Sequence, residues 1–72
     1  MGTIIEQCEQ LTGRYHGRTV DIWCDDHKLY IFIAPGVCTL KSVYFSTPDH
    51  ALMILNRWQN NLTQGVFDAN YF

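Results

Sequence analysis

Residues 19–34, TVDIWCDDHKLYIFIA, constrain the fold of this chain most strongly, because they predict a β-hairpin with apolar side chains on both faces. β-Branched and aromatic residues fill both arms, and the polar residues 25–27 between them are typical of a turn. Side chains alternate across a strand. One face therefore carries Val20, Ile22, Cys24, Leu29, Ile31 and Ile33, and the other carries Trp23, Tyr30 and Phe32. A sheet built on this hairpin needs cover on both faces.

The chain is short for such a sheet, because a domain of 72 residues buries only about 60% of the surface that its unfolded form exposes. Charged residues make up 17% of the sequence, below the roughly 25% of average soluble domains, so little polar surface is available. We therefore expect a single small domain over residues 1–72 that hides apolar surface in a homo-oligomer or against a protein partner.

Charge and cysteine content narrow the function classes. The net charge of −2 gives a weak field, which argues against binding of nucleic acid or anionic lipid. The three cysteines, at positions 8, 24 and 38, do not form a disulfide framework and indicate reduced thiols. The N-terminal residues lack the cationic start of a secretory signal, and no apolar run reaches the length of a membrane span. We expect a cytoplasmic protein without a membrane association.

The first fifteen residues permit two interpretations. In the first, Thr3 caps a helix that runs to Leu11, and Glu6 completes a capping box. In the second, the segment is a strand that turns at His16-Gly17 and pairs with the first arm of the hairpin. The sequence leaves helix and strand both open over residues 4–12.

Two more elements follow the hairpin. Pro35-Gly36 ends its second arm, and residues 37–46 predict a third strand, whose imperfect alternation indicates a bulge or two covered faces. Thr47 suits a helix N-cap and Pro48 the first helical position, so a helix should run from Pro48 to about Asn60. Its apolar stripe consists of Ala51, Leu55, Trp58 and Leu62, joined by Leu52, Met53 and Ile54. A helix that is apolar nearly all round is typically buried on several sides.

These elements predict an α+β fold, with a three- to four-stranded antiparallel sheet and the helix from Pro48 packed across one face. The N-terminal segment should lie across an edge or on the other face, and the strand order stays open. Residues 63–72 are a tail with late aromatic residues. We expect it to fold back as an edge strand or pack on its own sheet, with docking on a neighbouring molecule as the alternative.

No catalytic or cofactor motif is present in the sequence, so we expect no enzyme activity and no cofactor. Cys24 and His27 have a Cys-x-x-His spacing, but a structural zinc site needs four ligands, and we predict no metal site. Three cysteines and three histidines could supply a nucleophile and a base, but nothing in their spacing predicts that they converge.

The leading hypothesis is a small non-enzymatic regulatory or adaptor protein that binds a protein partner, or a second copy of itself, through the aromatic face. The predicted contact residues are Trp23, Tyr30, Phe32 and Tyr44, with Phe67, Tyr71 and Phe72 from the tail. The alternative is a single-stranded nucleic-acid-binding module in which the same aromatics stack on bases. Its positive charges would be Arg14, Arg18, Lys28 and Lys41, which Asp21, Asp25 and Asp26 largely offset. Protein binding is therefore favoured.

Overall fold

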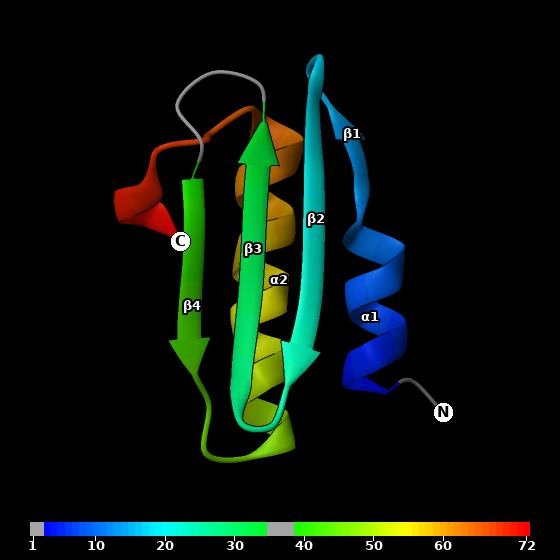
Figure 1. The fold of residues 1–72 in the computed structure, drawn as a ribbon, viewed down its shortest axis with the longest axis vertical. Helices are drawn as coiled ribbons and strands as arrows, with labels where there is room; N and C mark the ends of the chain where they lie inside the picture. The colour runs from blue at the N-terminus through cyan, green and yellow to red at the C-terminus, as the bar shows by residue number, and fades with distance from the viewer. Residues whose placement is uncertain (1–2, 35–38) are drawn as a thin grey trace.

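The computed structural model describes residues 3–34 and 39–72, which form an antiparallel sheet backed by helices (Figure 1). The elements are α1 (Ile4–Leu11), β1 (Gly13–Tyr15), β2 (Arg18–Asp25), β3 (Lys28–Ala34), β4 (Thr39–Tyr44), α2 (Pro48–Gln64) and the 3₁₀ helix η1 (Ala69–Tyr71). Each strand pairs antiparallel with its sequence neighbour, in the order β1-β2-β3-β4. The predicted α+β class is confirmed. The expected turn at Pro35-Gly36, and Val37 and Cys38 of the expected third strand, lie outside the described residues.

The N-terminal segment uses both of its predicted structures in succession. Thr3 caps α1, because its hydroxyl accepts a hydrogen bond from the Glu6 amide (3.1 Å) and donates one to the Glu6 carboxylate (3.2 Å). The chain then forms β1, which returns into β2 through the predicted turn at His16-Gly17. Both turn residues have positive φ, 53° and 81°, as two-residue hairpin turns of the primed type require.

Two hydroxyl groups link α1 to the sheet, that of Tyr15 in β1, which donates a hydrogen bond to the Leu11 carbonyl oxygen (2.6 Å), and that of Thr12. The hydroxyl of Thr12 accepts a hydrogen bond from the Ile22 amide (3.0 Å) and lies within hydrogen-bonding distance of the Ile22 carbonyl oxygen (3.1 Å). It also lies 2.9 Å from the Cys8 carbonyl oxygen, one helical turn back. The pairing of β1 with β2 ends at Val20. Beyond this point, the Thr12 hydroxyl is the hydrogen-bond partner for the backbone of Ile22 at the same edge of β2. This places α1 beside β2, where it also contacts α2.

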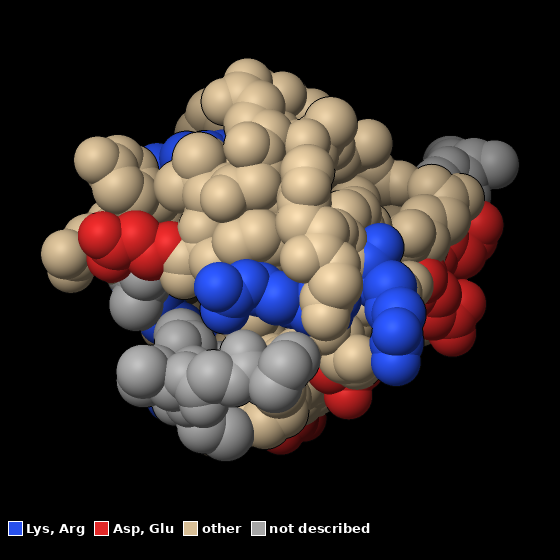
Figure 2. All heavy atoms as spheres, turned by 90° about the horizontal axis from the view of Figure 1, so that it is seen from above, with Lys and Arg blue, Asp and Glu red and all other residues tan. Residues whose placement is uncertain are grey.

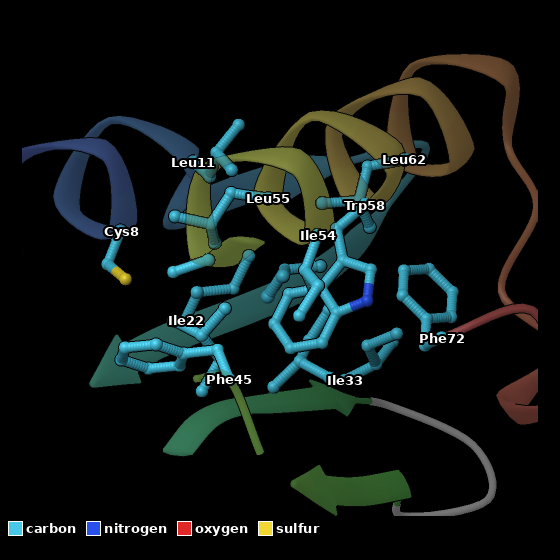
Figure 3. Close-up of a cluster of buried hydrophobic side chains, with 14 residues drawn as sticks. Cys8, Leu11, Ile22, Ile33, Phe45, Ile54, Leu55, Trp58, Leu62 and Phe72 are labelled. Atoms are coloured by element: carbon cyan, nitrogen blue, oxygen red, sulfur yellow. The ribbon is translucent and has the colours of Figure 1, made fainter. Parts of the chain in front are cut away.

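The hydrophobic core lies between the sheet and α2 (Figure 3). Its buried members are Val20, Ile22, Leu29, Ile31 and Ile33 from the sheet, Ala51, Ile54, Leu55, Trp58 and Leu62 from α2, and Cys8, Leu11, Phe45 and Phe72 from elsewhere. The predicted apolar stripe of α2 is thus confirmed. Met53, however, is 66% exposed, so α2 is not buried on several sides as expected. The reason is that α2 packs on one sheet face, and the described chain provides no layer outside it.

The helix α2 continues one turn beyond its expected end at Asn60. Leu62 is completely buried, so the apolar stripe holds the chain in the helix past the two asparagines. Gly65 ends the helix with a left-handed φ of 79°. Its amide bonds the carbonyl oxygen of Leu62 (3.2 Å), and the Val66 amide bonds that of Asn61 (2.8 Å).

The tail after α2 returns to the core and forms η1, without an edge strand among its described residues. Phe72 is 4% exposed, and its ring centroid lies 6.2 Å from that of Trp58. Figure 3 shows the indole nitrogen of Trp58 on the side toward Phe72. Within the described residues this buried nitrogen has no conventional hydrogen-bond partner, and an aromatic ring is a weak acceptor for it. The side chain of Asn61 also holds the tail, by donating to the Tyr71 carbonyl oxygen (2.9 Å).

Within the described residues, no helix is both long and apolar enough to cross a membrane.

Replacing Thr12 with valine should lower the free energy of unfolding by about 1–2 kcal/mol, because the backbone groups of Ile22 lose their partner at a partly buried edge. Urea denaturation followed by circular dichroism measures this change. Thr19→Val is the matched control at an exposed strand position, and it should change the free energy by less than about 0.5 kcal/mol. Equal losses in the two variants would contradict the structural role of the Thr12 hydroxyl.

Phe72→Ala should destabilise the fold by about 3 kcal/mol, because it leaves a cavity beside Trp58. Tyr71→Ala is the control, since the Tyr71 side chain is 61% exposed and its truncation should cost little. Thermal and urea unfolding measure both changes. An unchanged stability of Phe72→Ala would show that the tail does not pack on the core in solution.

Candidate functional site

One face of the sheet is left without cover by the described chain. α2 lies behind the strands in Figure 1, α1 contacts α2, and the tail packs on α2 through Phe72. The strand register places Trp23 opposite Tyr30, and Phe32 opposite Leu40, on the side away from α2. Tyr44 follows on the same side of β4. We call the surface formed by Trp23, Tyr30, Phe32, Leu40 and Tyr44 the open face.

Two aromatic side chains of the open face, Trp23 and Tyr30, are in contact with each other. The rings of Trp23 and Tyr30 stack with centroids 5.3 Å apart and an interplanar angle of 5°. Trp23 remains 38% exposed, and Leu40 and Tyr44 are 63% and 62% exposed. Tyr30 and Phe32, on the inner strand β3, are half-buried. The result is an apolar surface on which the rings of Trp23 and Tyr30 are already stacked in the free protein.

Charges of both signs surround the open face. By register, Arg14 and Lys28 lie on this side of the sheet together with Asp21 and Asp25, so their formal charges cancel. Seen from the end that carries the β1–β2 turn, the basic side chains in view are separated by uncharged residues (Figure 2). Neither observation gives the continuous positive surface that a phosphate backbone requires.

The structure separates the predicted contact residues into two groups. Trp23, Tyr30 and Phe32 lie on the open face, as the alternation predicted, and the pairing of β4 with β3 adds Tyr44 to the same face. The tail aromatics lie elsewhere and close the domain. Phe67 lies under the Arg18 guanidinium group, 4.8 Å from its ring centroid, and packs against the core, where Phe72 is buried. Tyr71 is exposed on η1.

Leu40 is a member of the open face that sequence reasoning did not single out, although it shares the strand phase of Tyr44. The pairing of β4 with β3 is regular from Thr39 to Tyr44, so the expected bulge is absent from these residues. The irregular alternation has another cause: Lys41 occupies the helix side, opposite Ile31, at the edge of the sheet. A charged side chain is tolerated there because the edge position is only partly buried.

A second candidate is a cleft of about 300 Å³ at the end of the molecule where both helices begin. Its apolar lining includes Ile4, Ile5, Phe45 and Pro48. Cys24 and His27 also line this cleft, so the structure brings the Cys-x-x-His pair together. Burial raises the pKa of the Cys24 thiol, and the neighbouring Asp25 and Asp26 raise it further. A thiol with a raised pKa carries little thiolate at neutral pH, which makes it a weak nucleophile and a weak metal ligand.

The described residues contain no cluster of three or more His, Cys, Asp or Glu side chains able to hold a metal ion. Comparisons with protein-family models, curated proteins and solved structures gave no match for this chain. The chemistry of its own surfaces is therefore the basis for assigning a function, and the open face is the candidate that carries the predicted contact residues Trp23, Tyr30, Phe32 and Tyr44.

The two described cysteines should differ in reactivity toward iodoacetamide at pH 8. Burial raises the pKa of the Cys8 thiol to about 11, with further contributions from Cys24 and Glu9, and its side chain is 2% exposed. We expect slow alkylation of the partly exposed Cys24, and alkylation of Cys8 only after unfolding. Peptide mass spectrometry distinguishes these sites from Cys38. Equal rates at Cys8 and Cys24 in the folded protein would contradict this arrangement.

Proposed function

We propose that this protein is a small non-enzymatic interaction module that binds a partner protein through the open face. The observation that carries the proposal is the Trp23–Tyr30 stack beside the exposed Leu40 and Tyr44, on a sheet face that the described residues leave uncovered. Large aromatic side chains are the commonest centres of binding energy in protein interfaces. Since the rings are held in place before binding, little conformational entropy is lost when a partner docks.

The same geometry favours a protein over a single-stranded nucleic acid. Bases bind to proteins by stacking on free aromatic ring faces. Trp23 and Tyr30 each have one ring face against the other, which leaves fewer ring faces for bases. Strong binding of a phosphate backbone also needs an excess of cationic side chains, whereas Arg14 and Lys28 are balanced by two aspartates on this side.

The size of the open face indicates a modest affinity. Strands spaced about 4.8 Å apart, with about 3.3 Å per residue, give a four-stranded sheet of this length a face of roughly 400 Å². Each protein in a standard interface contributes about 800 Å². A contact confined to this face is therefore in the range of weak, reversible regulatory interactions.

Phe32→Asp should abolish partner binding, because it places a carboxylate at the centre of the open face, opposite Leu40 and beside Asp21. Affinity capture from cell extract, quantified by mass spectrometry, compares this variant with the wild-type protein. Met53→Asp is the matched control, because it introduces the same charge at an exposed apolar position of α2. We expect proteins retained by wild type and Met53→Asp to be lost with Phe32→Asp.

Circular dichroism establishes that the Phe32→Asp variant is folded, and Tyr44→Asp, at a more exposed position, replaces it if it is not. A folded variant that retains the same partners would overturn the proposal. Binding of mixed single-stranded oligonucleotides that weakens steeply with salt, and is lost with Phe32→Asp, would support the nucleic-acid alternative instead.

A further inference from the structure

The strand β4 forms one edge of the sheet, and its hydrogen-bonding groups alternate in direction. The Phe45 amide donates to the His27 carbonyl oxygen (2.9 Å), toward β3. Because the bonding side of an antiparallel strand alternates residue by residue, the backbone groups of Leu40, Ser42 and Tyr44 point away from the sheet. Within the described residues, these outward-pointing groups have no hydrogen-bond partner.

The outward-pointing residues are arranged symmetrically, with Leu40 and Tyr44 at equal distances on either side of Ser42. We infer that a second copy of this chain pairs with β4 in antiparallel orientation, with Ser42 facing Ser42 of the other copy. In this register each outward amide meets a carbonyl oxygen of the second strand. The two sheets then form one continuous sheet about a two-fold axis at Ser42, as closed homodimers require.

The side chains are complementary in this register. On the open face, Leu40 lies opposite Tyr44 of the other copy, so that two side chains exposed by 63% and 62% cover each other on both sides of the axis. On the helix side, Lys41 lies opposite Val43, and its aliphatic stem packs along the valine. The two Lys41 residues are diagonal neighbours at about 7–8 Å. No like charges lie directly opposite each other.

Edge pairing enlarges the open face, whereas face-to-face pairing of two copies would cover it. A two-fold axis perpendicular to the sheet leaves both open faces on the same side, which gives a joined surface of roughly 800 Å², as much as one partner contributes to a standard interface. Binding of a partner protein to this joined surface rests on the proposed function, whereas the pairing of the two β4 strands does not. The other edge of the sheet is the three-residue β1, continued by α1, so the pairing ends at two copies.

Ser42→Pro tests the pairing with little effect on the fold, because proline removes only an amide that points away from the sheet. Sedimentation velocity at several protein concentrations is the measurement. We expect a monomer–dimer equilibrium for the wild type and a monomer for Ser42→Pro. Ser42→Val keeps the amide and should dimerise at least as well as the wild type. A wild type that is monomeric up to its solubility limit would overturn the inference.

A disulfide tests the register. In a chain whose three native cysteines are replaced by alanine, Ser42→Cys should form a cross-linked dimer on oxidation, because directly paired residues have Cα atoms about 5.5 Å apart. Leu40→Cys should cross-link much less, since its counterpart lies several residues away. Cross-linking of Leu40→Cys in preference to Ser42→Cys would overturn the proposed register.

Phe32→Asp separates this inference from the proposed function. It should leave the sedimentation dimer intact, because Phe32 takes no part in edge pairing. A dimer that Phe32→Asp dissociates and Ser42→Pro does not would place the second copy on the open face and overturn edge pairing. A dimer lost only with Ser42→Pro, in a protein whose open face binds nothing, would support edge pairing and contradict the proposed function.

Discussion

Leu55, Trp58 and Leu62 of α2 are completely buried against one face of the sheet, and the other covering elements depend on this contact. α1 reaches the same side through the Thr12 hydroxyl and packs beside α2. The tail fills the remaining gap on this side by placing Phe72 next to Trp58. Because α1 and the tail pack on the same side of the sheet as α2, the described residues leave a second apolar face without cover.

The elements that could be predicted from the sequence are those specified by neighbouring residues. Alternation in the hairpin assigned Trp23 and Tyr30 to one face, because side-chain direction in a strand depends only on the parity of the position. Thr47 and Pro48 located the start of α2 for a similar reason: a cap satisfies amides two or three residues away. In the structure the Thr47 side chain accepts a hydrogen bond from the His50 amide at 3.1 Å.

The features that could not be predicted depend on contacts between distant segments. The position of α1 beside β2 depends on the contact between the Thr12 hydroxyl and the backbone of Ile22, ten residues along the chain. The extension of α2 beyond Asn60 depends on a core that buries Leu62. Phe72 looked like a free contact residue, because its aromatic ring fits a binding surface and a core equally well; only the gap beside Trp58 distinguishes the two. For the candidate site, the alternation of side chains along the strand was sufficient to place Trp23 and Tyr30 on one face. The position of the tail aromatics could be found only from the tertiary structure.

The apolar character of the open face is not explained by the core, which lies on the other side of the sheet. Antiparallel sheets with one wet face usually alternate apolar and polar residues, so polar side chains at these positions would leave the core unchanged. Cross-strand stacking of Trp23 on Tyr30 contributes roughly 0.2–1 kcal/mol to folding, which accounts for part of the pattern. It does not account for Leu40 and Tyr44, whose largely exposed side chains gain little from folding. The exposed apolar surface of these two side chains is removed from water only if another molecule covers it, either a partner on the open face or a second copy along the edge of β4.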